Sequence, residues 1–213
     1  MSSQEYFNSI AMQWNQMRQT YFQQDVRPWI FQRFDPSHKV IADIGSGTGF
    51  LALSMAKKAK FVFAIDQSIQ MLHLLQKKIA DEQIGNVMAI HHDMKQSFLL
   101  DKTLQAITMN MSLHHISRPD ELILQLYRLL DDGGELVISD VMEHRGEWAR
   151  AEMHDEWLGF HPDVLRKWLL DAGFEQIEIF DTKIKAVAYS SVNERVDPNI
   201  FIAIARKGVS GEV

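Results

Sequence analysis

The feature that most constrains this chain is a glycine-rich segment, VIADIGSGTGFLAL, at residues 40–53. An apolar run ends at Ile44, and Gly45, Gly47 and Gly49 follow before a helical pattern begins. Glycine has no Cβ, so the turn can be tight and a ligand can lie against its backbone. The sequence therefore predicts a ligand site where a first strand passes into a helix.

Apolar runs of strand length alternate with helix-period segments along the rest of the chain, a pattern typical of a mostly parallel sheet covered by helices. Strands are expected at residues 39–44, 61–65, 86–91, 105–109, 135–140, 175–180 and 199–205, and helices at 50–58, 68–81, 117–130 and 161–173. Ser117 is expected to cap the third of these helices, and Gly173 to end the fourth.

Composition excludes several function classes. The chain has 213 residues, room for one large domain, and no cysteine, so disulfides, thiolate metal sites and cysteine nucleophiles are impossible. Its 22 basic and 28 acidic residues give a net charge of −6, which disfavours nucleic acid as a partner. The polar N-terminus lacks signal-peptide features and no apolar run approaches bilayer length, so we expect a cytoplasmic protein without membrane contact.

The register of the glycines separates two kinds of ligand. Dinucleotide sites use G-x-G-x-x-G to bring a helix N-terminus to a pyrophosphate, whereas this chain reads G-x-G-x-G with Phe50 at the place of the third glycine. Asp43 lies two residues before the first glycine, where its carboxylate would repel a pyrophosphate and attract an ammonium or sulfonium group. The pattern favours a cationic ligand, with an NAD(P)-dependent oxidoreductase as the alternative.

The segment DIGSGTG resembles the first motif of class I S-adenosylmethionine-dependent methyltransferases, and the likeness extends over about residues 38–206. It implies a Rossmann-like single domain whose seven-stranded, mostly parallel sheet has an antiparallel last strand and helices on both faces. It also implies S-adenosylmethionine as cofactor and S-adenosylhomocysteine as product. In that family the acid at Asp66 binds the ribose hydroxyls, and Asp93 and Met94 contact the adenine. The cofactor contacts implied are Asp43, Gly45, Ser46, Gly47, Gly49, Asp66, Gln67, Asp93, Met94 and Asn110.

The stretch NMSLHHI after the fourth strand is similar to that of small-molecule methyltransferases related to the quinone-biosynthesis C-methyltransferases. Histidine titrates near neutrality, so His114 is the candidate catalytic base, while His115 is expected to hold the loop by bonding backbone. No metal is expected, because His91 and His92 point in opposite directions and Asp93 is assigned to adenine. The acceptor is expected to be a small molecule, methylated by in-line displacement at oxygen, carbon or nitrogen.

The N-terminal segment, residues 1–35, is expected to be helical and separate from the methyltransferase domain at 36–213. Its stripe of Tyr6, Ile10, Trp14, Met17 and Tyr21 is expected to pack on the sheet, or alternatively to form a lid over the site. Aromatic and methionine side chains at Met12, Trp14, Met17, Trp148, Met153 and Trp157 suggest an apolar acceptor pocket. A non-catalytic S-adenosylmethionine-binding module stays open, as does the oligomeric state.

Overall fold

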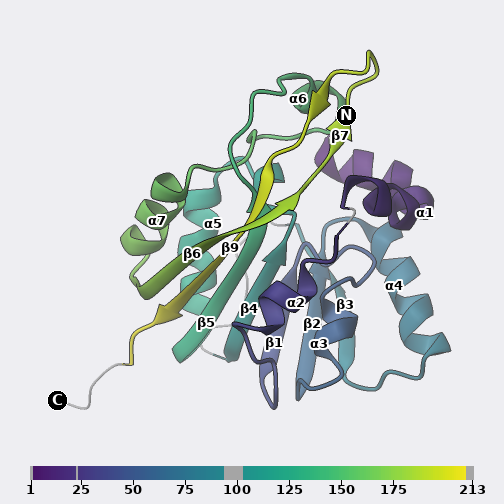
Figure 1. The fold of residues 1–213 in the computed structure, drawn as a ribbon. Helices are drawn as coiled ribbons and strands as arrows, with labels where there is room; N and C mark the ends of the chain where they lie inside the picture. Colours follow the sequence, from purple (N-terminus) through teal and green to yellow (C-terminus); the bar gives the residue numbers. More distant parts are fainter. Residues whose placement is uncertain (1, 23, 94–102, 210–213) are drawn as a thin grey trace.

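A computed structural model describes residues 2–22, 24–93 and 103–209, and its centre is a seven-stranded sheet in the order β3-β2-β1-β4-β5-β9-β6 (Figure 1). Strands β1 to β5 pair in parallel, and β9 runs antiparallel to both of its neighbours. The strands are β1 (Val40–Ile44), β2 (Phe61–Asp66), β3 (Val87–His91), β4 (Leu104–Asn110), β5 (Leu130–Val141), β6 (Phe174–Lys185) and β9 (Asn199–Lys207). The expected architecture, including the antiparallel last strand, is confirmed.

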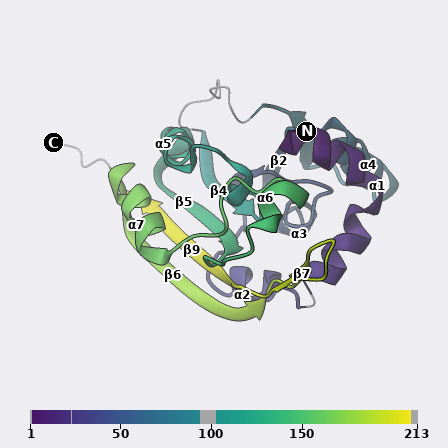
Figure 2. The same cartoon turned by 90° about the horizontal axis from the view of Figure 1, so that it is seen from above.

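Helices cover both faces of the sheet because its strands are apolar on both sides (Figure 2). In β5, Leu136 and Ile138 pack in one apolar cluster with α5 and α7, and Val137 packs in a second with α2, α3 and α4. These helices are α2 (Arg27–Phe31), α3 (Ala52–Met55), α4 (Ile69–Asp81), α5 (Pro119–Leu129) and α7 (Pro162–Asp171). In the described part of the chain, no helix has the length and apolarity that crossing a membrane requires.

Three local expectations differ from the structure. Helix α5 begins at Pro119 with Arg118 at its N-cap, so Ser117 is not the cap. Proline needs no amide partner at the first helical position, and its ring keeps the preceding residue out of the helical conformation. The helix expected at 50–58 is only the single turn of α3, flanked by turns. The short hairpin of β7 (Ala188–Tyr189) and β8 (Arg195–Val196) was not expected at all.

Helix α1 (Ser3–Tyr21) does not pack on a face of the sheet, as its apolar stripe suggested. It begins with a capping box in which Ser2 and Glu5 bond each other's backbone amides, and it lies beside α4. The Ser68 hydroxyl donates to the Asn8 side chain at 2.7 Å, which holds the two helices together. Together with α6 (Trp148–Glu152) and the hairpin, α1 lies over the carboxyl ends of the parallel strands (Figures 1 and 2).

Candidate active site

The glycine-loop cavity, of about 860 Å³, opens at the carboxyl ends of β1, β2 and β4 beneath α1. Parallel strands bring their carboxyl ends to one edge, so residues far apart in sequence meet there. Its walls include the glycine loop, the acids that end β1 and β2, and aromatic side chains of the N-terminal segment. Among them are Phe7, Trp14, Phe22, Asp43, Gly45, Ser46, Gly47, Phe50, Asp66, Gln67, Asn110, Met111 and His115.

Two glycines of the loop have different tasks. A Cβ on Gly47 would point into open space, with only the Trp14 indole nitrogen nearby at 3.8 Å. A Cβ on Gly49 would lie 2.5 Å from Leu75, in the interface with α4. Both have positive φ, +54° and +89°. Gly47 therefore leaves its backbone open toward the cavity, whereas Gly49 lets the loop pack on the helix behind it.

Two buried carboxylates, Asp43 and Asp66, accept hydrogen bonds from the glycine loop and from the segments next to it. Asp66 accepts hydrogen bonds from the Gly47 amide at 2.7 Å and from the Ser68 amide at 2.8 Å. Asp43 accepts from the Thr108 hydroxyl at 2.6 Å and from the Ala52 amide at 3.1 Å. Burial raises the pKa of Asp43 to about 7, against these hydrogen bonds, and the charge of Asp66 adds to the rise. A cation in the cavity would favour the ionised form of Asp43.

The structure gathers most of the residues expected to bind the cofactor. Asp43, Gly45, Ser46, Gly47, Asp66, Gln67 and Asn110 line the glycine-loop cavity. Gly49 lies behind it, Asp93 lines a neighbouring polar recess, and Met94 falls outside the described residues. The Ser46 hydroxyl is buried with no hydrogen-bond partner in the described part of the chain. The open face at Gly47, this orphan hydroxyl and the two carboxylates fit a polar, cationic nucleoside ligand.

A second cavity, here called the histidine chamber, adjoins the first. Its lining is mostly apolar and comes from α1, the loop after β4, α6 and the hairpin region. The residues are Tyr6, Phe7, Trp14, Tyr21, Phe22, Met111, His114, His115, Val141, His144, Ala149, Met153, Asp155, Ala186, Val187, Ala188, Val196 and Pro198. Phe7, Trp14, Phe22, Met111 and His115 line both cavities, so the two share one wall.

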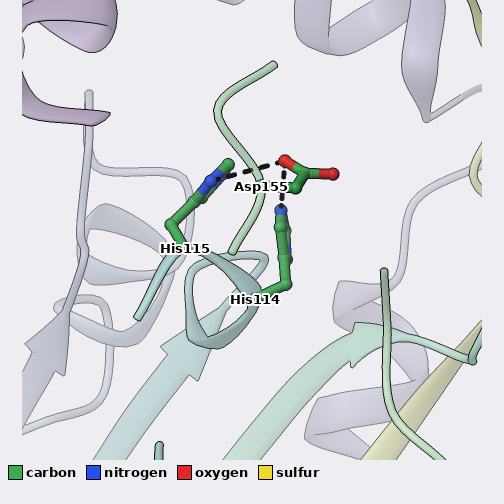
Figure 3. Close-up of side chains that lie close together, drawn as sticks. All are labelled: His114, His115 and Asp155. Carbon is green, nitrogen blue, oxygen red and sulfur yellow. Dashed lines mark ion pairs between the residues drawn. The ribbon is translucent and has the colours of Figure 1, made fainter. Parts of the chain in front are cut away.

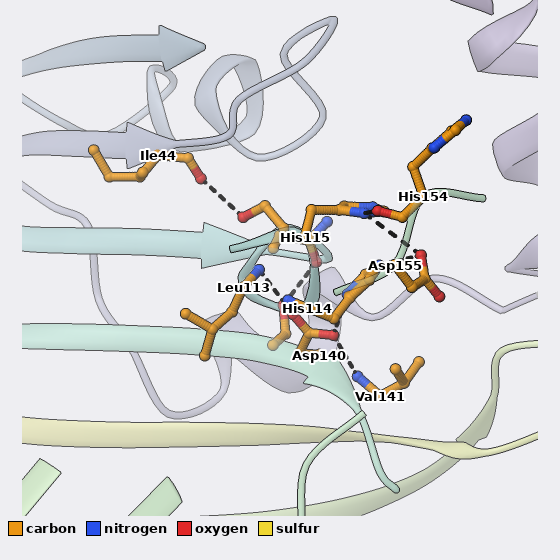
Figure 4. A network of polar contacts seen from close by, with 11 residues as sticks. Ile44, Leu113, His114, His115, Asp140, Val141, His154 and Asp155 are labelled. Carbon is orange, nitrogen blue, oxygen red and sulfur yellow. Dashed lines mark hydrogen bonds and ion pairs between the residues drawn. The ribbon is translucent and has the colours of Figure 1, made fainter. Parts of the chain in front are cut away.

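The chamber contains a buried histidine fixed by a carboxylate (Figure 4). His114 Nδ1 lies 2.6 Å from Asp140 Oδ1, and the His114 side chain is 8% and the Asp140 side chain 0% exposed. Asp140 also accepts from the backbone amides of Leu113 and Val141, at 3.0 and 2.7 Å. These amides keep the carboxylate in place, and the carboxylate keeps the His114 ring in one orientation, with Nε2 away from Asp140.

On its other side His114 faces Asp155, which also faces His115 (Figure 3). His114 Nε2 is 3.8 Å and His115 Nδ1 is 3.4 Å from Asp155 Oδ1. His115 Nδ1 also lies 3.3 Å from the carbonyl oxygen of His154, which agrees with the expected backbone bond. The side chains of His114, His115 and Asp155 lie close enough together to hold one metal ion.

Charge and burial compete at this cluster. Burial alone would lower the pKa of His114, but the carboxylates of Asp140 and Asp155 outweigh it and raise the pKa to about 9. Burial raises the pKa of Asp155 to about 6, against the attraction of His114. Burial and the neighbouring His114 lower the pKa of His115 well below its usual value. The carboxylates of Asp140 and Asp155 therefore favour the protonated form of His114, whereas His115 favours its neutral form.

Sequence reasoning found His114 and missed Asp155. The acid lies in an irregular stretch between α6 and α7, where no motif marks it. Of the apolar side chains expected to line an acceptor pocket, Trp14 and Met153 do so, while Met12 is 83% exposed. Trp157 instead stacks near Phe160 in the core. Nothing in the sequence indicates which of these apolar side chains line the chamber, and only the packing of the folded chain distinguishes them.

The family model and the curated relatives that match this chain are methyltransferases. Residues 41–134 match a family model described as a methyltransferase domain. A ubiquinone biosynthesis O-methyltransferase of Pseudomonas paraeruginosa (strain DSM 24068 / PA7) is 25% identical over 228 residues, covering 94% of this chain and 95% of the relative. A similar enzyme of Pseudomonas putida (strain GB-1) is 25% identical over 200 residues, covering 84% of this chain and 83% of the relative.

Solved structures show the same fold. A SAM-dependent methyltransferase from Aquifex aeolicus superposes with a TM-score of 0.69 at 19% identity, covering 93% of this chain and 97% of the other. Haemonchus contortus phosphoethanolamine N-methyltransferase 2, in complex with S-adenosyl-L-methionine, has a TM-score of 0.77 at 15% identity, covering 98% of this chain and 60% of that one. These likenesses show that the chain has the Rossmann-like fold of such enzymes.

Proposed function

We propose that this chain, which is a class I S-adenosylmethionine-dependent methyltransferase, methylates a hydroxyl group on a small molecule with an apolar body. The observation that carries this proposal is the histidine chamber, which shares a wall with the glycine-loop cavity. Its aromatic and aliphatic lining suits an apolar body, as the mostly apolar lining of small-molecule pockets does. The curated relatives are named as O-methyltransferases, which supports oxygen as the acceptor.

In the glycine-loop cavity we propose that Asp66 accepts hydrogen bonds from the ribose hydroxyls. Each of its oxygens already accepts one backbone amide, and a carboxylate has about four acceptor positions, which leaves room for two more donors. Gly47 would let the ligand lie against the loop, and Ser46 would find the partner that its buried hydroxyl lacks. S-adenosylmethionine supplies an activated methyl group on a sulfonium centre when it is bound there.

For the acceptor we propose His114 as the residue in contact with the hydroxyl. Asp140 holds its Nδ1, so Nε2 is the nitrogen left to face the chamber. A group fixed on both sides by buried contacts stays in one position, and methyl transfer depends on holding the reacting atoms in line. The carboxylate Asp140 is therefore a positioning residue, and its effect reaches the acceptor only through the histidine ring.

Of the segment 1–35, we propose that α1 acts as a lid over the methyltransferase domain, whereas α2 packs on the sheet and belongs to that domain. Phe7 and Trp14 of α1 line both cavities, so the helix covers the place where the two ligands meet. Contacts of α1 with the loops beneath it include the 2.7 Å hydrogen bond from the Thr48 hydroxyl to the Asn15 side chain and an edge contact between the Phe7 and His115 rings. Movement of α1 would open both cavities without disturbing the sheet.

The first test is a pair of binding and turnover measurements on the full chain. S-adenosylmethionine and S-adenosylhomocysteine, but not NAD, should raise the melting temperature. A panel of apolar compounds that carry a hydroxyl should then yield S-adenosylhomocysteine, whereas matched compounds with an amine or no heteroatom should not. Methylation confined to the amine members would contradict the oxygen assignment, and no product from any small molecule would contradict the acceptor class.

The second test separates the histidine from the cofactor site. His114→Gln should lower kcat at least about 100-fold and leave the thermal shift with S-adenosylmethionine intact. The matched control is His73→Gln, which removes an exposed histidine from α4 and should change neither quantity. Full activity in His114→Gln would exclude the residue from catalysis.

A further inference from the structure

Three potential metal ligands of the histidine chamber are arranged around one point. The atoms are His114 Nε2, His115 Nδ1 and Asp155 Oδ1, and all lie within 4.8 Å of one another. Asp155 Oδ1 is 3.8 Å from the first and 3.4 Å from the second. Ligands bonded to one tetrahedral ion at about 2.0–2.1 Å would be about 3.3–3.4 Å apart. The two distances to Asp155 Oδ1 are thus within about half an ångström of that spacing, and the two histidine nitrogens lie no more than 4.8 Å apart.

We propose that His114, His115 and Asp155 form a binding site for a divalent transition-metal ion that holds the oxygen of the methyl acceptor. The fourth position would face the chamber, as an open position does in catalytic rather than structural metal sites. This inference deepens the proposed function and rests on it for the identity of the acceptor atom, whereas ion binding itself does not depend on it. With the ion present, His114 Nε2 holds the hydroxyl through the ion instead of contacting it directly.

The surroundings of the ligands support an ion. The other ring nitrogen of His114, Nδ1, donates a hydrogen bond to the Asp140 carboxylate at 2.6 Å. This is the carboxylate–histidine arrangement that orients histidine ligands in metal proteins. Asp155 Oδ1 is buried and makes no hydrogen bond within the described part of the chain. Its ion-pair contacts with His114 and His115 are longer than hydrogen bonds, and an ion bound to all three side chains would take the place of the proton on His114 Nε2. With Asp140 and Asp155 both beside His114, negative charge exceeds positive at the point where the ion would lie.

The ligand set indicates which ions would bind. Two imidazoles and one carboxylate suit zinc, cobalt, nickel, iron or manganese, whereas magnesium and calcium prefer oxygen ligands alone. His115 Nδ1 also lies 3.3 Å from the His154 carbonyl oxygen, and an ion would replace that contact. His144 lines the same chamber outside the cluster of three, with its Nδ1 accepting from the Gly146 amide at 3.2 Å.

An ion at this position would assist the reaction by lowering the pKa of the bound hydroxyl. The acceptor proton leaves to solvent, the oxygen forms a bond to the methyl carbon, and the sulfur–methyl bond breaks with its electron pair remaining on sulfur. The products are the methyl ether, the neutral thioether and one proton. Charge and atoms balance without a further reactant, and the ion is unchanged at the end.

The test titrates chelator-treated full-length protein with Co²⁺, whose visible absorption is strong in four- or five-coordinate sites. We expect a single saturable site, displaced by Zn²⁺. Asp155→Asn, which keeps the shape of the ligand and removes its charge, and His115→Gln should each weaken binding more than about 100-fold. Asp140→Asn should weaken it by about 10–100-fold, the usual effect of changing a residue that orients a ligand. The control His73→Gln should bind as the unaltered protein does.

Retention of the thermal shift with S-adenosylmethionine shows that a variant is folded. Absence of saturable Co²⁺ absorption, or binding that Asp155→Asn leaves unchanged, would overturn the metal site. Equal methylation of hydroxyl acceptors by chelator-treated and zinc-loaded protein would overturn its role in the reaction and leave the proposed function intact. Saturable binding without methylation of any hydroxyl would instead refute the proposed function and leave the ion site standing.

Discussion

The two cavities differ in what builds them. The glycine-loop cavity is made of backbone and of acids that end consecutive parallel strands, so its parts are placed by the sheet itself. The histidine chamber is made of side chains from α1, the loop after β4, α6 and the hairpin, segments that no single element holds together. Under the proposed function, we expect the first cavity to bind the cofactor and the second, built from loops and short elements, to determine the acceptor. Substitutions should separate the two functions accordingly.

The largest effect expected in the glycine-loop cavity is that of Asp66→Ala. Removing the carboxylate deletes the acceptors for two ribose hydroxyls and releases the Gly47 amide, and hydrogen bonds to a charged group contribute about 1.5–3 kcal/mol each. Affinity for S-adenosylmethionine should fall at least about 100-fold, and the thermal shift should vanish. The control is Asp81→Ala, which removes an exposed acid from α4. If calorimetry showed that Asp66→Ala binds S-adenosylmethionine as tightly as the unaltered protein, Asp66 would not be a cofactor-binding residue.

A second pair of variants divides binding from folding within one loop. Gly49→Ala should lower the free energy of unfolding by about 2–4 kcal/mol, because its Cβ would lie 2.5 Å from Leu75 at a positive φ. Gly47→Ala should lower the free energy of unfolding by less, about 1–2 kcal/mol. Its main effect should be a lower affinity for S-adenosylmethionine, since its Cβ points into the cavity. Urea unfolding and calorimetry measure the two quantities. Equal losses of stability would contradict the division.

The same contrast explains what the sequence could and could not predict. The succession of strands and helices, the glycine turn and the acids at Asp43 and Asp66 follow from local patterns, because each lies at a fixed place along the chain relative to its own strand. Asp155 lies 41 positions after His114, in a stretch without periodicity, and meets it only through tertiary packing. Trp14 and Met12 belong to one helix, yet one lines a cavity and the other faces solvent.

A smaller effect should appear in the chamber alone. Ala188 of β7 lines it and is 9% exposed, whereas the next residue, Tyr189, is 52% exposed, because successive side chains of a strand point to opposite sides. Ala188→Leu should raise the KM for the acceptor about tenfold, since extra methylenes in a packed space cost about 1–3 kcal/mol. Affinity for S-adenosylmethionine should stay unchanged, and Tyr189→Leu should alter neither. A weaker cofactor affinity in Ala188→Leu would mean that the two cavities are coupled.

The smallest effect concerns the pH dependence of cofactor binding. Burial raises the pKa of Asp43 to about 7, so near neutrality the free protein is partly protonated there. A cationic ligand favours the ionised carboxylate and lowers its pKa, so binding releases a proton. Affinity should therefore rise with pH up to about 7 and level off above it, by at most about tenfold per unit.

Calorimetry in buffers of different ionisation enthalpy would measure the released proton directly. Asp43→Asn should abolish both the proton release and the dependence of affinity on pH, because an amide does not titrate in this range. The control substitution Asp81→Asn, at an exposed acid, should change neither quantity. S-adenosylhomocysteine lacks the sulfonium charge and keeps the ammonium group. If it shows the same slope as S-adenosylmethionine, Asp43 responds to the ammonium group; a flatter slope would place the sulfonium closer. Either result locates the positive charge that the first acid of the glycine segment receives.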